Sequence, residues 1–480
     1  MIIYNDLKLA KELIKYPTIT PTDAGVMNFF SKRLSKIGFR CKILEFKEKN
    51  FKPVKNLYAR IGNKSPNFCF AGHLDVVPPG NLADWSINPF NPKVKNNHLL
   101  GRGANDMKSS IACFTSAVSI FLKENKNFKG SVSFLITGDE EGVAINGTKK
   151  VVDFLKKKKE KIDFCLVGEP TNPNKLGEMI KIGRRGSLTG HITINGVQGH
   201  VAYPKRANNP SNCIIKILKK LSEIKFDNGN KNFQPSNLEI TRINIENSAD
   251  NIIPGTATAT FNIRFNNKHS SSSLKKKLNK VISNISKKNK CRYKVTYSVS
   301  GESFLSKKND TTLMIQKIIK KVTKEKAILS TTGGTSDARF IRKISPCLEF
   351  GLVGKTMHKI DEAVSLNDLR NLTKDDYFNN LVDKIMNKRE QISKGFSAKK
   401  PIIVKISPDE SIDNLEKIVS YCKQSGVDGF ILTNTSLDHD YKIPGGLSGS
   451  QLRHKAEESL KFVRSTVGQE TNIIASGGIM

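Results

Sequence analysis

The sequence has few of the residues that would point to a disulfide scaffold, a membrane protein or a single-strand nucleic-acid binder. Its 480 residues contain 8 cysteines, none in a CxxC pair, and 1 tryptophan. The longest helical apolar run, residues 111–122, is too short to span a bilayer. The first residues lack the profile of a signal peptide. We therefore expect a protein of the reducing cytoplasm with no membrane partner.

Acidic residues are also scarce. The chain has 44 Asp and Glu against 79 Lys and Arg, which gives a formal net charge of +35. A basic, non-catalytic nucleic-acid-binding protein is one interpretation of this charge. The lysines are spread along the whole chain, however, and they are not interleaved with aromatic residues as in single-strand binders. We interpret the charge as a compositional bias and do not expect a nucleic-acid partner.

Apolar strands alternate with helices over much of the chain, and a chain of this length accommodates two or three domains. Alternation of this kind predicts an α/β fold with a largely parallel, helix-flanked sheet. Two helices are predicted within residues 1–38. Further on, the pattern predicts strands at 40–46, 56–61, 67–72, 132–136 and 162–167, and helices at 109–123, 144–158 and 366–388. Residues 76–108 are expected to form a long irregular loop.

The pattern changes twice, and these changes suggest domain boundaries. Strands at 187–195, 238–245 and 256–265 with helices at 208–224 and 271–286 predict an inserted α+β domain over residues 184–297. The flanking segments, 1–183 and 298–390, then form one domain. Residues 398–480 carry short buried strands at 401–406, 430–433 and 472–475, which indicate a separate βα segment.

Acids and histidines stand where the predicted strands end, and this edge is where open α/β sheets bind ligands. The strand 132–136 runs into Asp139, Glu140 and Glu141, whose like charges require compensation. Other candidates at strand ends and in loops are His73, Asp75, Asp106, Glu169 and His358. Two imidazoles with several carboxylates and no thiolate suit Zn²⁺ or a similar divalent ion.

Two ions that share one carboxylate would polarise a carbonyl and activate a water molecule, with a free carboxylate as the base. Each residue also has a simpler interpretation. An acidic turn is usually solvated, and a lone histidine is usually a surface or core residue. The joint pattern across successive strands favours the metal site.

Several motifs resemble the M20 family of di-zinc aminoacylases and peptidases, and they occur in the order of that family. They lie at residues 73–78, 101–108, 138–142 and 168–170. The motifs that most resemble succinyl-diaminopimelate desuccinylases of this family lie at 186–188, 196–204, 332–337 and 357–362. The resemblance covers residues 4–388. It implies a zinc-exopeptidase-like mixed sheet flanked by helices, with an inserted ferredoxin-like dimerisation domain.

The resemblance also implies a role for each matching residue. Asp106 would bridge two zinc ions, or cobalt ions, with His73 and Glu169 on one and Glu141 and His358 on the other. Glu140 would be the general base and acid. Asp75 would orient His73, and His200 would reach the active site of the other subunit of a homodimer to stabilise the oxyanion. Positions near the substrate would be Arg184, Asn251, Arg264, Gly333 and Thr335.

The reaction implied is hydrolysis of N-succinyl-LL-2,6-diaminopimelate to succinate and LL-2,6-diaminopimelate, in lysine biosynthesis. A dicarboxylic N-acyl amino acid would give the arginines a partner, because guanidinium pairs with carboxylate. Alternatively, Arg184 and Arg185 hold the hinge between domains. Within the family, the alternative reaction is deacylation of another N-acyl amino acid, such as acetylornithine.

The C-terminal segment has a resemblance of its own. Residues 401–409, 433–438 and 445–449 resemble dihydroorotate dehydrogenase, an FMN-binding TIM-barrel enzyme, with Lys405, Thr433, Asn434 and Thr435 at flavin- or orotate-contacting positions. Three strands cannot close an eight-stranded barrel. We expect a partial TIM-barrel-like fragment that is inactive and binds no FMN. A bifunctional enzyme with a working flavin half is the alternative.

Overall fold

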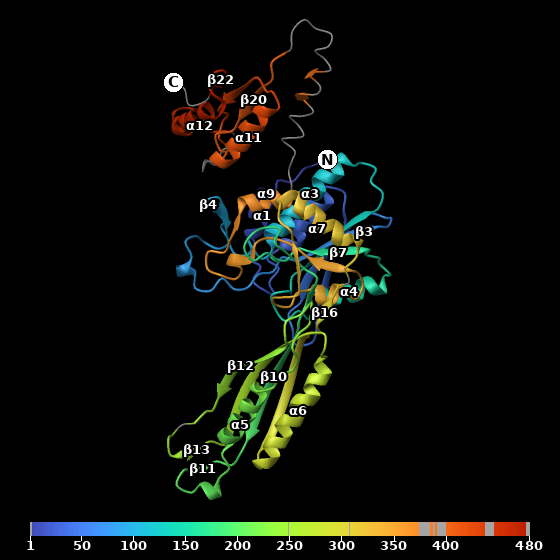
Figure 1. The fold of residues 1–480 in the computed structure, drawn as a ribbon, viewed down its shortest axis with the longest axis vertical. Coiled ribbons are helices and arrows are strands. Elements are labelled where there is room, and N and C mark those ends of the chain that lie inside the picture. Colours follow the sequence, from blue (N-terminus) through green and yellow to red (C-terminus); the bar gives the residue numbers. More distant parts are fainter. Residues whose placement is uncertain are drawn as a thin grey trace. The chain divides into compact units, whose positions relative to one another are not determined.

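The computed structural model describes residues 2–247, 249–306, 308–373, 385–386, 389–390, 400–436 and 446–476. It divides the chain into two compact units, Met1–Thr373 and Lys374–Met480 (Figure 1). The first unit contains a helix-flanked sheet and an inserted domain. The predicted helix 366–388 is seen only as α9 (Leu366–Thr373), because most of residues 374–388 lie outside the described residues.

The main sheet of the first unit has eight strands in the order β1-β2-β6-β3-β7-β18-β8-β17. Its strands are β1 (Arg40–Phe46), β2 (Val54–Gly62), β3 (Asn67–His73), β6 (Ser131–Thr137), β7 (Phe164–Val167), β8 (Met179–Lys181), β17 (Ile328–Ser330) and β18 (Cys347–Glu349). Neighbours among β6, β3, β7 and β18 are parallel, whereas β1 and β2 run antiparallel to their neighbours. The predicted helix-flanked mixed sheet is confirmed. The parallel centre brings the carboxyl ends of β6, β3 and β7 to one edge.

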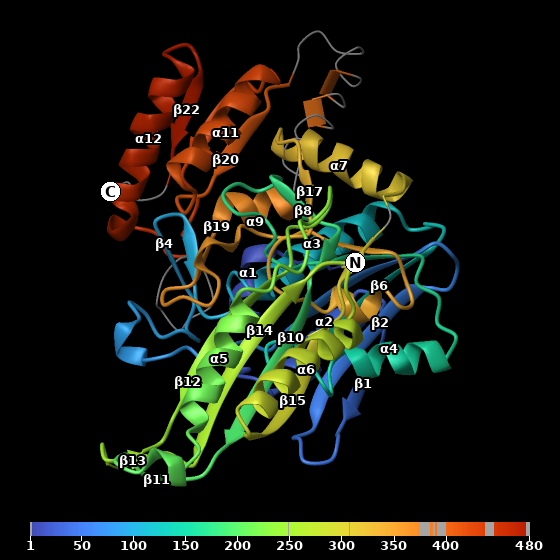
Figure 2. The same cartoon turned by 60° about the horizontal axis from the view of Figure 1, so that its bottom comes forward.

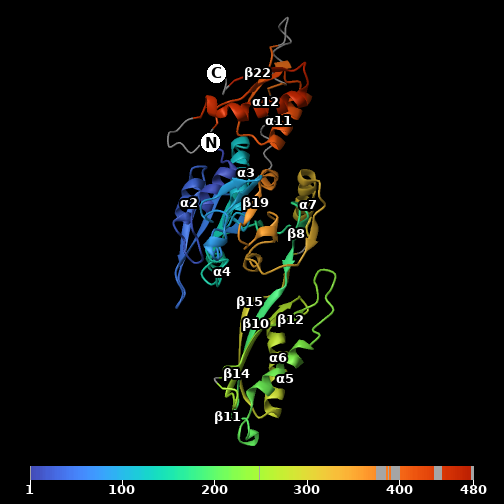
Figure 3. The same cartoon turned by 90° about the vertical axis from the view of Figure 1, so that its left-hand side faces the viewer.

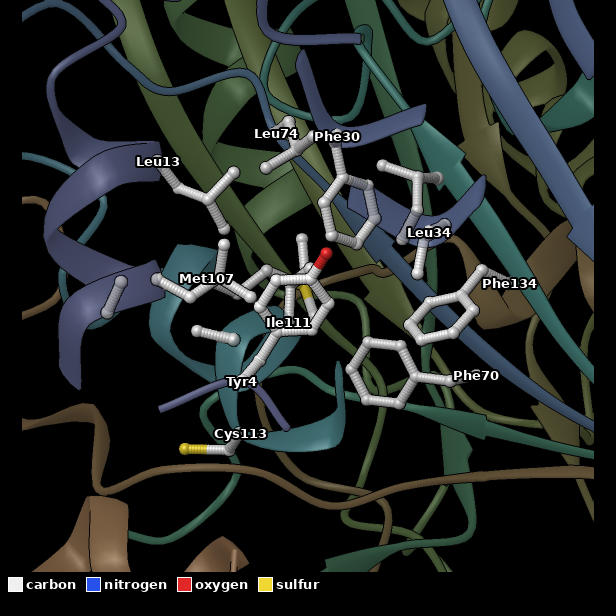
Figure 4. Packing of buried hydrophobic residues seen from close by; sticks show 14 of the residues in the cluster. Tyr4, Leu13, Phe30, Leu34, Phe70, Leu74, Met107, Ile111, Cys113 and Phe134 are labelled. Atoms are coloured by element: carbon white, nitrogen blue, oxygen red, sulfur yellow. The ribbon is translucent and has the colours of Figure 1, made fainter. Parts of the chain in front are cut away.

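Helices cover both faces of this sheet, because successive side chains of a buried strand point to opposite faces. Phe70 of β3 packs with Phe134 of β6 in a core formed with α1 (Asp6–Ile14), α2 (Val26–Ser35), α3 (Lys108–Glu124) and α9. Figure 4 shows this packing around Phe70, Met107 and Phe134. The alternate residues Cys69 and Ala71 pack on the other face with α4 (Thr148–Lys157) and α8 (Ala338–Ile341). A further helix, α7 (Asp310–Thr323), packs near β8 and β17.

Two local predictions are wrong. Residues 76–108 are not uniformly irregular, because β4 (Lys93–Lys95) and β5 (His98–Leu100) form a sheet with β19 (Ala363–Ser365). The helix predicted from residue 144 begins at Thr148. The reason is Asp139, whose carboxylate accepts hydrogen bonds from the backbone N–H groups of residues 144–146 and holds them in a turn.

The inserted domain has an antiparallel sheet of its own in the order β12-β14-β10-β15. Its strands are β10 (Gly186–Asn195), β12 (Asn237–Asn244), β14 (Thr256–Phe265) and β15 (Arg292–Gly301). Helices α5 (Pro210–Ser222) and α6 (Ser271–Lys288) pack on one face of the sheet (Figures 2 and 3). Gly190 is required where Phe261 crosses β10, because an added Cβ would lie 2.2 Å from the Phe261 ring. A small ribbon, β11 (Gly199–His200) with β13 (Ile252–Ile253), extends from this domain.

The inserted domain leaves and re-enters the first unit through two adjacent strands. β9 (Gly183–Arg184) pairs antiparallel with β16 (Phe304–Leu305), so that Arg184 lies opposite Phe304. The two ends of the insertion are therefore held side by side by backbone hydrogen bonds.

The second unit contains a parallel three-stranded sheet in the order β20-β21-β22, formed by β20 (Ile403–Ile406), β21 (Gly429–Leu432) and β22 (Asn472–Ala475). Helices α11 (Ile412–Gln424) and α12 (Arg453–Val467) share a core with Phe430 and Leu432. These are the predicted βα elements, although Gly445 of the predicted turn at 445–449 lies outside the described residues. Within the part of the chain that the structure describes, no helix has both the length and the apolarity to cross a membrane.

Candidate metal centre

The parallel strands place three groups of polar residues at one edge of the main sheet. His73 is the last residue of β3, Glu140 and Glu141 follow β6, and Glu169 follows β7. Gly168 lets β7 approach this edge closely, because an added Cβ would lie 2.4 Å from the ring of Phe70. The apolar strands therefore end at the same level, and their carboxyl ends expose acids and a histidine to a common space.

Two loops complete this cluster. Asp106 lies in the turn before α3, and His358 lies in the loop before β19 in the left-handed region, with a φ of 64°. The two oxygens of the Asp106 carboxylate face different imidazoles. Oδ1 lies 3.0 Å from His73 Nε2, and Oδ2 lies 3.3 Å from His358 Nε2. Asp106 therefore stands between the two histidines, as a bridging carboxylate must.

The outer positions of the cluster are filled by the remaining acids. His358 Nε2 lies 2.8 Å from Glu141 Oε1, and His73 Nε2 lies 4.0 Å from Glu169 Oε1. Ligand atoms lie within 4.8 Å of one another in two sets, one of His73, Asp106 and Glu141 and the other of His73, Glu140 and Glu169. The structure thus brings together every residue that was predicted to bind metal.

The shortest contact of Asp75 with His73 is made by its backbone. The backbone carbonyl of Asp75 lies 2.9 Å from His73 Nδ1, whereas its carboxylate is 3.7 Å away. The carboxylate instead accepts hydrogen bonds from the backbone N–H groups of Glu140 and Glu141, at 3.2 and 3.0 Å. Asp75 therefore fixes the turn that carries both glutamates. Its carbonyl can only accept, so that Nδ1 of His73 carries a proton and Nε2 is the atom available to a metal.

The pKa values of the clustered residues are shifted in the directions expected where several buried carboxylates lie close together and attract positive charge. Burial, followed by the nearby charge of Asp106, raises the pKa of Glu169 to about 8. Burial and then Glu169 raise the pKa of Glu140 well above its usual value. Burial would raise the pKa of Asp106, but its hydrogen bonds with His358 and His73 lower it overall. Hydrogen bonds with Asp106 and then Glu141 raise the pKa of His358 to about 10.

Without a cation, therefore, protons compensate the clustered carboxylates. Divalent ions would serve the same purpose, because a nearby positive charge favours the ionised form of an acid. The donor set of imidazole nitrogens and carboxylate oxygens fits zinc or cobalt. The residues present therefore fit a pair of divalent ions.

The cluster opens into a cavity of about 360 Å³. Asp106, Glu140, Glu141, Glu169 and His358 line one side of it, and the predicted substrate residues Arg184, Gly333 and Thr335 also line it. Arg184 is not free to bind a ligand with its whole fork, because its Nε lies 3.0 Å from both carboxylate oxygens of the buried Glu349. This contact with Glu349 supports the alternative interpretation, in which Arg184 has a structural role at the hinge between the domains.

Lys181 is a cavity residue that the sequence motifs did not reveal. Its side chain is buried, and its Nζ contacts Thr332 Oγ1 at 2.6 Å, Met179 Sδ at 2.8 Å and Ser330 Oγ at 3.5 Å. None of these atoms carries a charge. Burial, followed by the repulsion of Arg184, lowers the pKa of Lys181 to about 8. A buried lysine whose contacts are neutral is a ready partner for a carboxylate in the cavity.

Three predicted residues lie outside this cavity. His200 and Asn251 belong to the exposed ribbon of the inserted domain, where Nδ1 of His200 accepts a hydrogen bond from Ala202 N at 3.1 Å. Arg264 lies on β14 opposite Ser187, within the sheet of that domain. In a single chain, these residues are not among those that line the cavity of the metal cluster.

Comparison with known proteins gives two family matches. Residues 69–374 match the model of peptidase family M20/M25/M40, and residues 355–480 match that of dihydroorotate dehydrogenase. A relative from Pelagibacter ubique is 72% identical over 374 residues, which are 78% of this chain and 97% of the relative, and it is named succinyl-diaminopimelate desuccinylase.

Solved structures show the same fold at lower identity. An M20 family metallo-carboxypeptidase from Sulfolobus solfataricus is 17% identical with a TM-score of 0.63, and the match covers 77% of this chain and 97% of the other. A Bacillus subtilis protein, described as a dinuclear metal binding peptidase from the M20 family, is 14% identical with a TM-score of 0.57. That match covers 77% of this chain and 94% of the other.

Proposed function

This chain belongs to peptidase family M20/M25/M40, and from that premise we propose that it hydrolyses N-succinyl-LL-2,6-diaminopimelate to succinate and LL-2,6-diaminopimelate. The placement of Asp106, with one carboxylate oxygen toward each of two histidines, carries the proposed metal chemistry. The choice of substrate is supported by the Pelagibacter ubique relative, which is 72% identical to this chain over 374 residues and bears the name of that desuccinylase.

The residues proposed to hold two zinc ions, or cobalt ions, form two sets that share Asp106. His73 and Glu169 complete one set, and Glu141 and His358 complete the other. When bound, such ions supply the positive charge that polarises the amide carbonyl and acidifies water. Asp75 holds the backbone of Glu140 and Glu141, and through its carbonyl it fixes the ring of His73.

Glu140 is the proposed proton carrier. Its half-buried carboxylate lines the cavity beside the metal cluster, and neighbouring acids oppose its charge. In this position it accepts a proton from the attacking water and returns it to the amine nitrogen as the amide bond breaks. Glu140 needs no metal contact for this step. Its adjacency to Glu141 keeps it within reach of the same space.

The cavity residues outside the acid cluster are proposed to bind the acyl group. A succinyl group ends in a second carboxylate, and Lys181 offers it a buried ammonium whose contacts are neutral. Thr335 and Gly333 also line the cavity, and Arg184 contributes its Nη1, which donates to the carbonyl oxygen of Thr332 at 3.3 Å while Glu349 binds the rest of the guanidinium. An acetyl group carries no carboxylate to meet Lys181. This difference favours the succinylated substrate over acetylornithine.

We propose that the inserted domain forms a homodimer. In a single chain His200, Asn251 and Arg264 do not line the cavity, and a second copy of the chain would bring His200 to it. His200 would then stabilise the oxyanion of the other subunit, while Asn251 and Arg264 would contact its substrate. We also place the enzyme in the cytoplasm, which is supported by the 8 cysteines, all of them free thiols in the structure.

For the second unit we propose no flavin function. Its described residues form a three-stranded parallel sheet, whereas a TIM barrel needs eight strands to surround a cofactor at its carboxyl face. Lys405, Thr433, Asn434 and Thr435 lie in or just after these strands. Purified protein with flavin absorbance near 450 nm would contradict this proposal and support the bifunctional alternative.

Metal content and hydrolysis, measured on one preparation, test the proposed function. We expect two divalent ions per chain, and hydrolysis of N-succinyl-LL-2,6-diaminopimelate that greatly exceeds hydrolysis of acetylornithine. Preference for acetylornithine would contradict the substrate. Binding of DNA with a steep salt dependence, in protein that holds no metal, would favour the nucleic-acid alternative instead.

A further inference from the structure

Glu362 is a fully buried carboxylate that lies behind the metal cluster rather than in it. Its Oε1 accepts hydrogen bonds from the backbone N–H groups of Asn105 at 2.8 Å and Asp106 at 3.0 Å. Its Oε2 accepts hydrogen bonds from Gly103 N at 3.1 Å and Arg102 Nη1 at 2.7 Å. One carboxylate therefore holds the whole turn that presents Asp106.

Arg102 extends this contact to the loop of His358. Its buried guanidinium donates to the carbonyl oxygens of Lys359 at 3.2 Å and His358 at 3.5 Å. The backbone also joins the two loops, because Gly101 N donates to the carbonyl oxygen of Glu362 at 2.9 Å. Segments that are about 260 residues apart in sequence are thus fixed to each other at several points.

These two loops deliver the two residues whose side chains meet at the second set of ligands, where His358 Nε2 lies 3.3 Å from Asp106 Oδ2. The other set shares Asp106, but its two remaining ligands, His73 and Glu169, lie at the ends of β3 and β7, which the main sheet fixes without Glu362. A change in the spacing between the loops would therefore move His358 relative to Asp106 and leave His73 and Glu169 in place.

We propose that Glu362, acting with Arg102, is a positioning residue that sets the affinity of the ion bound by Asp106, Glu141 and His358. The inference rests on the proposed function for the ligand sets. The chemistry demands a carboxylate, because four donors converge on Glu362 and an amide has only one oxygen to accept them. In Glu362→Gln, one of the two carboxylate oxygens is replaced by an amide N–H₂ group. This group cannot accept a hydrogen bond and repels the two donors that it faces, so that the loops move apart.

Zinc binding to the full chain tests this role without any measurement of turnover. Each chelator-treated protein is titrated with zinc in metal buffers, and the two dissociation constants are measured. We expect Glu362→Gln to raise one constant by about 10- to 100-fold, as loss of a carboxylate behind a metal ligand typically does, and to raise the other constant much less. Glu362→Asp keeps the charge but shortens the side chain by about 1.5 Å, so that its raised dissociation constant should lie between those of the unsubstituted protein and Glu362→Gln.

Asp227→Asn is the matched control. Asp227 is also a buried carboxylate with four donors, namely Gly229 N, Ser236 N, Asn266 Nδ2 and His269 Nε2, but it lies in the inserted domain. This variant should lower the thermal stability of chelator-treated protein and leave both zinc constants unchanged. The comparison separates loss of fold stability from loss of position.

Equal weakening of both ions in Glu362→Gln, or no weakening in either, would overturn the positioning role. If Glu362→Gln does not fold, the same criteria apply to Glu362→Asp. Unsubstituted protein that binds fewer than two zinc ions would overturn the proposed function together with this inference. Two ions in the unsubstituted protein, with no selective loss in the variants, would overturn only the role of Glu362.

Discussion

Lys181→Met removes the positive charge that we expect to meet the distal carboxylate of the substrate. A hydrogen bond to a charged group contributes about 1.5–3 kcal/mol, which corresponds to a factor of roughly 10–150 in kcat/KM. The substitution should cost this factor with the N-succinyl substrate. It should cost much less with the N-butyryl analogue, which has the same length but ends in a methyl group. Steady-state kinetics on both substrates measure the difference.

The same substitution should not weaken the fold. The pKa of Lys181 falls from 10.5 to about 8, so that its charge costs free energy in the folded chain. Part of that cost is offset by the contact with Thr332. We therefore expect the free energy of unfolding of Lys181→Met to be unchanged or higher by up to about 2 kcal/mol at pH 7, measured by urea unfolding.

The pH dependence of stability independently tests whether the charge of Lys181 destabilises the fold. Between pH 8 and 10.5 the unfolded chain binds the proton of this lysine more tightly than the folded chain does, so that stability from this group rises as pH rises. Lys181→Met should lack that rise. In the unsubstituted enzyme, the preference for the succinyl over the butyryl substrate should fall above pH 8. Equal losses on both substrates, or a strong destabilisation at pH 7, would refute this account of Lys181.

The remaining predictions concern proton transfer, assembly and the core. Glu140→Gln should keep both metal ions and lose about 10²- to 10⁴-fold in kcat, measured with metal analysis on the same sample; near-normal turnover would exclude Glu140 as the base. His200→Ala should lower kcat without loss of metal, and mixing it with Glu140→Gln should restore part of the activity if sites form between subunits; loss of zinc would contradict the oxyanion role. Lys108→Met should leave the free energy of unfolding at pH 7 within about 1 kcal/mol of the unsubstituted chain in urea, because burial lowers the pKa of Lys108 to about 7 and makes its charge costly, while loss of the hydrogen bonds from Nζ to the carbonyl oxygens of Leu13 and Tyr16 opposes that gain; a loss of more than about 3 kcal/mol would refute it.

The sequence was sufficient to predict the sheet and the gathering of acids and histidines at its edge, and the reason is local. Strands such as β3, β6 and β7 are short, mostly apolar runs, and a histidine or acids stand at or just after their ends, so that His73, Glu141 and Glu169 come to one edge of the sheet. Strands of three residues, such as β4 and β19, are too short to produce a recognisable period.

Partners that are distant in sequence could not be predicted in this way. Nothing near Arg184 in the chain indicates that Glu349, 165 residues away, binds most of its guanidinium. No sequence motif distinguishes Lys181 from the other basic residues of a chain that contains 79 lysines and arginines. Only its burial in the cavity wall distinguishes it. Nothing near Asp75 in the chain indicates that its carboxylate accepts hydrogen bonds from the backbone N–H groups of Glu140 and Glu141, about 65 residues away.

The pairing of β9 with β16 has a consequence for the history of such a chain. Because the ends of the insertion lie opposite each other, a short hairpin could replace residues 186–301 without moving the strands that enter and leave the main sheet. The inserted domain can therefore be gained, lost or exchanged with little change in the domain that contains the main sheet. Evolution can vary assembly and access to the cavity while the metal-holding scaffold stays the same.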